Sequence, residues 1–462
     1  MLKRIISDIL LASMLTAGLA ASGTEETAKD TSAPVSGNPS DSAQDATQPP
    51  PETEPLPDYT DFEFPEETDT LVVYTSGMLS QTLNPAVKIF REMYPEVTVD
   101  VRNLSEEEHQ TLLQTEIPAG GGPDLLFSYG IDLPDIYKTM TTGVFTDLNY
   151  YLYNDEEFNF EDYIQGVFTG GQIAGRQYMV PIQVQMPVVL TTMEILEENG
   201  IKPEQLATYE GFLDACTTFK NNNPDSDLLD FGAEDAFLVD LYDLCGLNFI
   251  DYAANTISMD KEALNKLVDV SKLYYNPNIG ERVAEGALSS FVNRKYMIRT
   301  YPTNSFLMVN DSAALVKFGN ETPYLTLVPD PYGGTTANIM TVAAIPEGSP
   351  NKLNAYRLLK ILLSEDVQYG ANAILGMPVH IESIRKNFAS SVEKNRAFEF
   401  DVTTEDYEPL IEKMQNITRA FVSPAIIRRY LKLEMTPYLT GTRSFDDCFD
   451  NLKNTIELYK DE

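Results

Sequence analysis

The chain has 462 residues, with 70 acidic and 33 basic side chains and a formal net charge of −37. Its length is sufficient for two or more domains with separate hydrophobic cores. So large an excess of negative charge repels nucleic acid and anionic membranes, and we expect neither as a partner. With only two histidines, His109 and His380, a catalytic triad or a histidine-rich metal site would depend on this pair. We expect both histidines to be structural or solvent-facing.

The first 22 residues have the features of an export signal. Lys3 and Arg4 precede the apolar run ILLASMLTAGLAA, which is followed by small residues. The sequence LAASG at 19–23 is similar to a bacterial lipobox, but Ser22 stands where the lipidated cysteine is required. We therefore expect an exported protein without a thioether anchor, unless this position was changed from cysteine. An uncleaved N-terminal membrane anchor is the alternative.

Residues 23–68 are rich in Ser, Thr, Pro and acidic residues and contain one basic residue, Lys29. The stretch PPPETEPLP favours an extended backbone, because proline fixes φ and has no N–H to donate. A segment of this composition buries too little apolar surface to fold. We predict a disordered acidic tether over 23–68, followed by a folded body that begins near Thr68.

The folded body opens with alternating strand and helix patterns. TLVVYTSG at 70–77 predicts a strand, the apolar spacing over 84–96 predicts a helix, and the alternating valines of 97–104 predict a half-buried strand. A helix is predicted over 105–117, where Ser105 and Glu108 have the spacing of a capping box, and a short buried strand over 124–128. This order is typical of an open α/β sheet with parallel strands.

Three consecutive glycines, 120–122, raise the question of a phosphate-binding loop. Such a loop follows a strand and opens a helix, whereas these glycines follow a predicted helix and precede a strand. The Lys-Ser/Thr pair of a phosphate loop is also missing, so we interpret the glycines as a helix exit. The turn Ser128–Tyr129–Gly130 is more informative, because ligands bind at the carboxyl ends of strands in α/β sheets.

Two extended stretches predict that the chain passes between two sheets. Residues 176–192 resemble a long strand broken by Pro181 and Pro187, and prolines interrupt strand pairing. Residues 322–346 show the same pattern, in which a strand, an interruption by Pro and Gly, and a second strand follow one another. Two such crossovers predict two lobes joined by two hinge strands. The regions predicted to be mostly helical are 204–300, 352–372 and 405–462.

The three cysteines, Cys216, Cys245 and Cys448, lack the CxxC spacing of a zinc or redox site. The sequence leaves two alternatives open, one disulfide or three unpaired thiols.

The order of motifs resembles the extracellular solute-binding proteins of ABC transporters, family 1, which is the maltose-binding-protein-like group. The resemblance rests on GGGPDLLFSYG, GVFTDLNYYL, RQYMVPIQVQMPVVLTTMEILEENGI, SPNKLNAYRLLKILLSEDVQYGANAILGMPVHIES and the terminal PYLTGTRSFDDCFDNLKNTIELYKDE. It covers roughly residues 69–462. It implies an α/β fold, the two-lobe periplasmic-binding-protein clamp of type II, with the lobes joined by hinge strands. Lobe one would comprise 69–182 plus 337–380, and lobe two 186–330 plus 381–462.

The resemblance also implies a ligand-binding cleft between the lobes. The segments expected to line it are at 75–77, 128–130, 183–185, 300–304 and 332–334. The residues expected to bind the solute are Thr75, Ser76, Gly77, Ser128, Tyr129, Gln183, Gln185, Tyr301, Asn304, Gly333 and Gly334.

Each of these positions also has a purely structural interpretation. Residues 75–77 are equally typical of a strand-to-helix turn, and Gln183 and Gln185 are equally typical of a solvated edge strand. Tyr301 stands in a polar loop where sugar-binding relatives place a stacking aromatic ring. Gly333 and Gly334 have the features of hinge or turn residues more than of ligand contacts.

The resemblance implies a solute receptor that closes on its solute and docks onto an ABC permease, and we expect the solute to be a carbohydrate. We expect a monomer that is not an enzyme and that needs no cofactor or metal. Trp is absent, but 25 Tyr and 22 Phe residues supply rings that can stack on a sugar. The alternatives are the same clamp with a polyamine, metal chelate, peptide or organic anion, a secreted glycoside hydrolase, and a sensor or adhesin.

Overall fold

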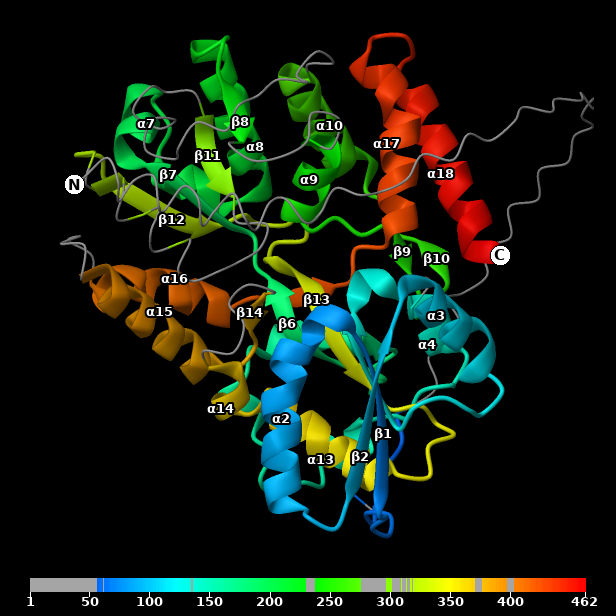
Figure 1. Ribbon diagram of the computed structural model, residues 1–462. Helices are drawn as coiled ribbons and strands as arrows, with labels where there is room; N and C mark the ends of the chain where they lie inside the picture. Colours follow the sequence, from blue (N-terminus) through cyan, green and yellow to red (C-terminus); the bar gives the residue numbers. More distant parts are fainter. Residues whose placement is uncertain are drawn as a thin grey trace, which may run out of the picture. The chain divides into compact units, whose positions relative to one another are not determined.

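Figure 1 shows the computed structural model of the chain. It describes residues 56–60, 62–133, 136–229, 237–275, 296–300, 309, 313, 316–317, 319–369, 376–396 and 403–462. All of these belong to the compact unit Thr53–Glu462. The export signal predicted over 1–22 lies outside the described residues. None of the helices within them is both long and apolar enough to cross a membrane.

The larger sheet is formed by seven strands: β1 (Thr70–Ser76), β2 (Thr98–Leu104), β3 (Leu125–Tyr129), β6 (Met179–Gln185), β13 (Thr336–Ala344), β14 (Met377–Pro378) and β15 (Arg419–Phe421). Their order is β14-β6-β13-β3-β1-β2, with β15 paired to β13. β1 is parallel to β2 and β3, which confirms the predicted β-α-β-α-β start. β13 is antiparallel to β3 and β6, and β3 and β15 lie end to end along one edge of it.

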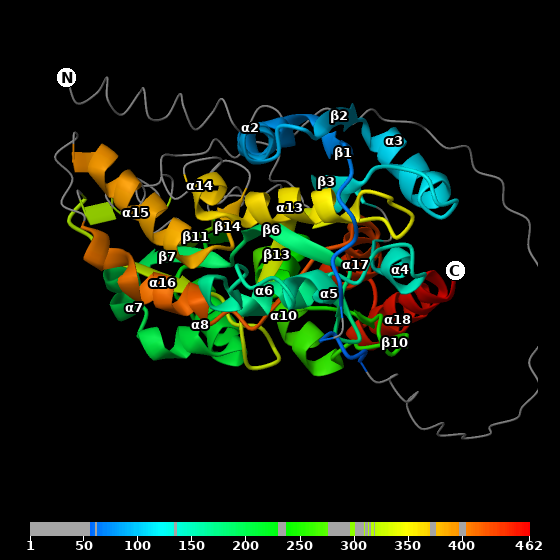
Figure 2. The same cartoon turned by 90° about the horizontal axis from the view of Figure 1, so that it is seen from below.

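Helices cover both faces of this sheet. In Figure 2, α13 (Lys352–Leu363) and α6 (Gln165–Phe168) lie on opposite sides of β6 and β13. α13 also packs against α2 (Ser80–Met93), an amphipathic helix. The buried stripe of α2 consists of Thr82, Leu83, Ala86, Val87 and Phe90. The other helices associated with this sheet are α3 (Glu106–Thr111), α4 (Ile136–Thr141), α5 (Asn149–Leu152), α14 (Glu365–Gln368) and α15 (Ile381–Arg396).

The smaller sheet has four strands in the order β12-β7-β11-β8. They are β12 (Pro323–Leu327), β7 (Val188–Thr192), β11 (Tyr296–Thr300) and β8 (Asp227–Leu229). The helices that follow or pack near this sheet are α7 (Met193–Glu198), α8 (Tyr209–Asn222), α9 (Phe237–Leu244), α10 (Lys261–Tyr274), α16 (Glu408–Gln415), α17 (Ala425–Leu439) and α18 (Phe445–Asp461). Two short hairpins complete the strands, β4 (Gln172–Ile173) with β5 (Arg176–Gln177), and β9 (Ile250–Asp251) with β10 (Thr256–Ile257).

The chain passes between the two sheets where the sequence predicts it. β6 belongs to the larger sheet and β7 to the smaller one, and β12 and β13 make the return passage. Pro187 lies between β6 and β7, as expected of a residue that interrupts pairing. The predicted break at Pro181 is wrong. Pro181 lies inside β6 and pairs with Val342, next to an irregularity in the ladder where a missing N–H is tolerated.

The folded body begins earlier than the sequence predicts. Within the segment assigned to the tether, the Tyr59 hydroxyl donates to Asp147 Oδ2 at 2.7 Å. The Phe62 ring lies 5.3 Å from the Tyr150 ring and 5.0 Å from the Tyr151 ring. Aromatic contacts of this kind bury enough apolar area to hold a segment that has no regular structure. The part of the tether from residue 56 onward is therefore docked on the body.

The structure answers two questions that the sequence raised, on the state of the cysteines and on the role of the glycine run. Cys216, Cys245 and Cys448 are buried free thiols, so the disulfide alternative is excluded. The glycine run at 120–122 lies between a helical segment and β3, and Gly120 has φ of +79°. This left-handed conformation is the one that favours glycine at a helix exit, as predicted.

A buried carboxylate joins β1 of the larger sheet to the segment that precedes α13. Asp124 Oδ2 accepts from the Val72 N–H of β1 at 2.7 Å and from Asn351 Nδ2 at 2.9 Å. Asp124 Oδ1 accepts from the Ser349 hydroxyl at 2.7 Å. Ser349 and Asn351 lie just before α13, so one side chain connects β1 to a segment more than two hundred residues further along the chain.

Replacing this carboxylate tests its contribution to stability. Asp124→Ala leaves three buried donors without an acceptor, and we expect the free energy of unfolding to fall by about 2–5 kcal/mol. Urea denaturation measures the change. Asp214→Ala, at an exposed aspartate of α8, is the control and should change stability by less than about 0.5 kcal/mol. Equal effects of the two substitutions would contradict the role given to Asp124.

Candidate functional site

A row of polar residues crosses four strands of the larger sheet near the carboxyl ends of β1 and β3. Ser76 Oγ of β1 lies 3.1 Å from Ser128 Oγ of β3. On β13, Thr341 is paired with Tyr129 of β3 on one side and with Gln183 of β6 on the other. We call Ser76, Ser128, Tyr129, Thr341 and Gln183 the polar row. Because ligands bind at such strand ends, the polar row is the candidate site.

The predicted residues differ in how far they are buried. Thr75 and Ser128 have no exposed surface, whereas Tyr129 and Gln185 are partly exposed. Gln183 is 6% exposed, and its Oε1 accepts from the Thr341 hydroxyl at 3.5 Å. Thr75 and Ser128 therefore support the edge from inside the sheet, and the side chains with accessible surface lie around them.

Gly77 continues from β1 into a short turn, η1 (Gly77–Leu79), that leads to α2. Its carbonyl accepts from the Ser80 hydroxyl at 2.9 Å. Residues 75–77 thus form the strand-to-helix turn that was one of their two interpretations. A contact with solute stays a prediction for them.

Tyr129 carries a hydroxyl that is buried and makes no hydrogen bond to any described residue. Burial, with a smaller contribution from the negative charge of Asp132, raises the pKa of Tyr129 to about 12. The hydroxyl is therefore protonated at neutral pH and able to donate. A buried polar group without a partner costs about 1–3 kcal/mol, so a bound solute that accepted this hydrogen bond would recover the cost.

Two residues beneath the polar row were not recognised as part of it from the sequence. The Ser76 hydroxyl donates to Asp132 Oδ2 at 3.0 Å, and Ser128 Oγ lies 2.9 Å from His109 Nε2. His109 has no exposed surface, which confirms its predicted structural role. Asp132 follows the end of β3 by three residues, and this position after a strand was the signal that could have identified it.

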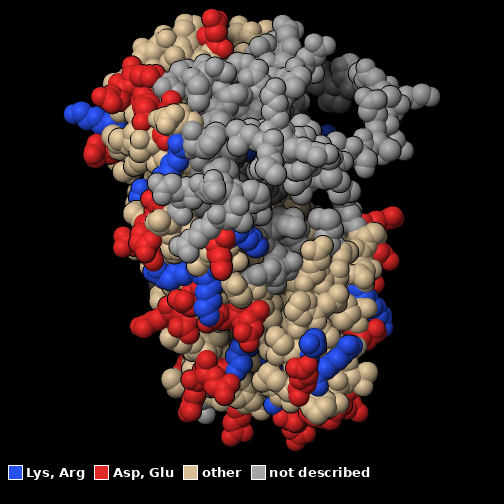
Figure 3. All heavy atoms as spheres, turned by 60° about the vertical axis from the view of Figure 1, so that its left-hand side comes forward, with Lys and Arg blue, Asp and Glu red and all other residues tan. Residues whose placement is uncertain are grey.

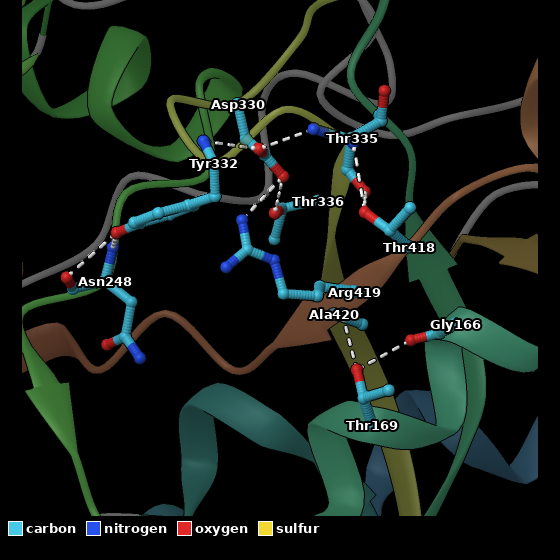
Figure 4. A network of polar contacts seen from close by, with 11 residues as sticks. Gly166, Thr169, Asn248, Asp330, Tyr332, Thr335, Thr336, Thr418, Arg419 and Ala420 are labelled. Carbon is cyan, nitrogen blue, oxygen red and sulfur yellow. Dashed lines mark hydrogen bonds and ion pairs between the residues drawn. The ribbon is translucent and has the colours of Figure 1, made fainter.

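The connection from β12 to β13 is organised by a buried aspartate, shown in Figure 4. Asp330 Oδ1 accepts from the N–H groups of Tyr332 at 2.9 Å and Gly334 at 3.0 Å. Asp330 Oδ2 accepts from the Thr336 hydroxyl at 2.7 Å and lies 2.9 Å from Arg419 Nη2. The carboxylate thus folds its own loop and binds it to β15.

Tyr332 extends this network to the region between α9 and β9. The Arg419 guanidinium lies over the Tyr332 ring, 3.9 Å from its centroid. The Tyr332 hydroxyl accepts from the Asn248 N–H at 3.1 Å and donates to the Asn248 carbonyl at 3.2 Å. The Tyr332 hydroxyl therefore both accepts and donates a hydrogen bond, which distinguishes it from the Tyr129 hydroxyl.

The glycines of the same loop are required by its geometry. Gly333 has φ of +84°, and a Cβ at Gly334 would lie 2.1 Å from Thr418 Oγ1. These are turn and packing roles, as one of their two interpretations predicted. Whether Gly333 and Gly334 also contact a solute is untested. The remaining predicted residues, Tyr301 and Asn304, lie outside the described residues.

Among the residues that the structure describes, no three His, Cys, Asp or Glu side chains are grouped so as to hold a metal ion. The polar row offers hydroxyl, amide and aromatic groups, which are suited to recognising a neutral polar molecule by hydrogen bonds and ring contacts.

Comparisons with known proteins agree with this arrangement. A family model described as bacterial extracellular solute-binding protein matches residues 76–369. No curated protein sequence matches the chain significantly.

Three solved structures illustrate the similarity in fold. The sugar-binding protein MalE from Xanthomonas citri is 17% identical with a TM-score of 0.61, over 85% of this chain and 97% of that one. A family 1 extracellular solute-binding protein from Alicyclobacillus acidocaldarius is 15% identical with a TM-score of 0.58, over 86% and 100%. A cyclic alpha-maltosyl-1,6-maltose binding protein from Arthrobacter globiformis is 18% identical with a TM-score of 0.56, over 85% and 98%. The predicted fold, a two-lobe α/β clamp, is confirmed.

The Asp330 network predicts a graded response to substitution. Asp330→Asn removes the charge that faces Arg419 and should lower the free energy of unfolding by about 1–3 kcal/mol. Tyr332→Phe keeps the ring under the guanidinium and removes only the contacts with Asn248, so we expect a smaller loss of about 0.5–1.5 kcal/mol. Urea denaturation of both variants checks the order. A larger loss in Tyr332→Phe would show that Asp330 does not organise the loop.

Proposed function

The chain belongs to the bacterial extracellular solute-binding proteins, and we propose that it is the receptor of an ABC importer for a carbohydrate. It binds the sugar by hinged closure of its two lobes and delivers it to the transmembrane subunits of a permease. No covalent step is part of this function, and the receptor acts as a monomer. Export carries it across the membrane, and Ser22 provides no thiol for a lipid anchor.

The observation that carries the proposal is the unpaired hydroxyl of Tyr129 in the polar row. Sugar recognition needs hydrogen-bond donors and acceptors arranged beside an aromatic surface. Tyr129 supplies a ring and a free donor, and Gln183 lies two strands away across Thr341. The names of the similar structures, a sugar-binding protein and a cyclic maltosyl-maltose binding protein, favour the same class of solute.

The distribution of strands supports the proposed lobes. We assign 69–182 plus 337–380 to lobe one and 186–330 plus 381–462 to lobe two, because the chain changes sheets at 186–187 and at 328–335. β15 and α15 are exceptions within the second set, since β15 pairs with β13 and α15 packs against β14 of the larger sheet.

The described surface fits a soluble small-molecule partner better than a polyanion. On the described part of the face shown in Figure 3, acidic and basic side chains are interspersed, and no broad area of this face is basic. Such a face lacks the positive patch that binds nucleic acid.

Thermal unfolding with a panel of solutes tests the class of ligand. A sugar at about one hundred times its dissociation constant should stabilise the protein by about 2.7 kcal/mol and raise its melting temperature. The panel contains mono- and oligosaccharides, polyamines, metal chelates, peptides and organic anions, tested on the chain without its first 22 residues. Stabilisation by a non-sugar alone would be consistent with a solute receptor, but it would contradict the proposal that the solute is a carbohydrate.

Tyr129→Phe tests the site itself. Removing a hydroxyl that has no hydrogen-bond partner among the described residues should leave the stability of the free protein unchanged or slightly higher. The affinity for the solute that stabilises the wild type should fall about fivefold to a hundredfold, which corresponds to the loss of one hydrogen bond of about 1–3 kcal/mol. Calorimetric titration measures the affinity, and thermal melting without solute measures the stability.

Tyr137→Phe is the matched control for this substitution. The Tyr137 hydroxyl accepts from the Val422 N–H at 2.7 Å and donates to the Gly170 carbonyl at 3.1 Å. Its removal should destabilise the free protein, whereas removal of the Tyr129 hydroxyl should not. A Tyr129→Phe protein that binds the solute as tightly as the wild type would remove Tyr129 from the site.

A further inference from the structure

A second pair of amide side chains extends the polar row along β6 and β13. Asn338 of β13 is paired with Gln185 of β6. Thr341 and Gln183, which belong to the polar row, form a pair further along the same two strands. Asn338 lies three residues before Thr341, on the side of the passage from β12, and its side chain is partly exposed. Its position therefore adds an accessible amide to the edge of the candidate site.

The backbone that follows β15 holds the Asn338 amide in one orientation. The Ser423 N–H donates to Asn338 Oδ1 at 3.2 Å. A backbone N–H only donates, so the amide oxygen must face Ser423 and the amide nitrogen must point elsewhere. Asn338 Nδ2 donates to no residue that the structure describes. Its two hydrogens are therefore available for a further hydrogen bond.

Ser423 is itself held in place by an ion pair. Its hydroxyl donates to Asp243 Oδ1 at 2.6 Å, and Asp243 Oδ2 lies 3.0 Å from Arg428 Nε. Asp243 belongs to α9 and Arg428 to α17, so the carboxylate connects the segment after β15 to two helices. A donor that its surroundings already hold in place loses less conformational entropy on binding. The support of Ser423 thus orients the Asn338 amide in advance of binding.

Asn338 and Tyr129 lie beside one close backbone contact. A Cβ at Gly130 would lie 2.9 Å from Val422 Cγ2 and 3.2 Å from the Ile339 carbonyl oxygen, so the missing side chain allows this approach. Ile339 follows Asn338 in β13, and Gly130 follows Tyr129 at the end of β3. The Tyr129 hydroxyl and the Asn338 amide nitrogen, which donate to no described residue, therefore come from adjoining positions in the fold.

We propose that Asn338 is a solute-binding residue, which donates from Nδ2 to an acceptor oxygen of the solute beside the Tyr129 hydroxyl. This role rests on the proposed function and adds a preference to it. An amide nitrogen carries two hydrogens and accepts none. The hydroxyl, ring and glycosidic oxygens of a sugar can accept from it, whereas the ammonium groups of a polyamine only donate. Asn338 thus favours a carbohydrate over a polyamine.

Two substitutions of Asn338 separate the donor from its structural contact. In Asn338→Asp one carboxylate oxygen still accepts from the Ser423 N–H, while the other replaces the donor by a charged acceptor. Asn338→Ala removes both groups. We expect both variants to bind the sugar about fivefold to a hundredfold more weakly than the wild type. Without sugar, Asn338→Asp should melt near the wild-type temperature, whereas Asn338→Ala should melt lower.

Calorimetric titration of the full chain measures these affinities. The probes are the sugars of the panel, with maltose, maltotriose, cellobiose and xylobiose among them, and spermidine as a molecule whose ammonium groups only donate. Asn451→Asp makes the same chemical change at an exposed position of α18 and is the matched control. Its affinity for the sugar should stay within about twofold of the wild type.

The outcomes distinguish this inference from the proposed function. A wild type that binds none of the sugars would contradict the proposed function, and the role of Asn338 with it, before any variant is made. If the wild type binds a sugar and Asn338→Asp binds it equally well, the role of Asn338 alone is overturned. A loss of affinity in Asn338→Ala only would then reflect the lost contact with Ser423. Tighter binding of spermidine than of any sugar by the wild type would also overturn the preference.

Discussion

The passage of the chain between its two sheets is the constraint on which the rest of the structure depends. Each sheet is assembled from segments far apart in the sequence, so the backbone must leave and re-enter both. The first two passages lie side by side, since the Val328 N–H donates to the Pro187 carbonyl at 2.9 Å. The Asp330–Arg419 ion pair connects the second passage to β15, from which the chain continues to α17. In the proposed hinged closure, motion between the lobes would be confined to these few connected segments.

Buried polar groups serve two different purposes at the two ends of the larger sheet. Asp124 is buried and accepts three hydrogen bonds, one from β1 and two from the segment before α13, so it joins this segment to the sheet. At the carboxyl ends of the same strands, Tyr129 keeps a buried hydroxyl that makes no hydrogen bond to a described residue. Buried donors are normally satisfied, and an exception at a strand end is a feature expected of a binding site rather than of a core. We therefore expect stability and solute binding to depend on separate ends of one sheet.

The parts of the fold that were predictable from the sequence are those with local causes. The strand at 70–77 and the helix at 84–96 follow from side-chain periodicity, and the Ser105–Glu108 capping box follows from residue spacing. The passage near Pro187 follows from the missing N–H of proline. The same argument failed at Pro181, because an irregular ladder accommodates it and no sequence pattern reports that irregularity.

The features that escaped prediction depend on tertiary contacts. Tyr59 is in a segment whose composition is typical of disorder, and it is held by Asp147, nearly ninety residues away. β15 spans only Arg419–Phe421, too few residues for a periodic signal within a region that is otherwise helical. His109 and Asp132 can be recognised as neighbours of the polar row only when helix α3, strand β3 and the turn at 130–132 are placed together in space. Among the predicted site residues, Tyr129 and Gln183 were brought to one row by the strand register.

The most direct test of the account is small-angle X-ray scattering of the protein with and without its stabilising sugar. A clamp that closes about the connected passages becomes more compact when the solute is bound. We predict a smaller radius of gyration and a shorter maximum dimension at saturation. Saturating binding of the sugar, measured by calorimetry on the same sample, with an unchanged scattering profile would contradict hinged closure.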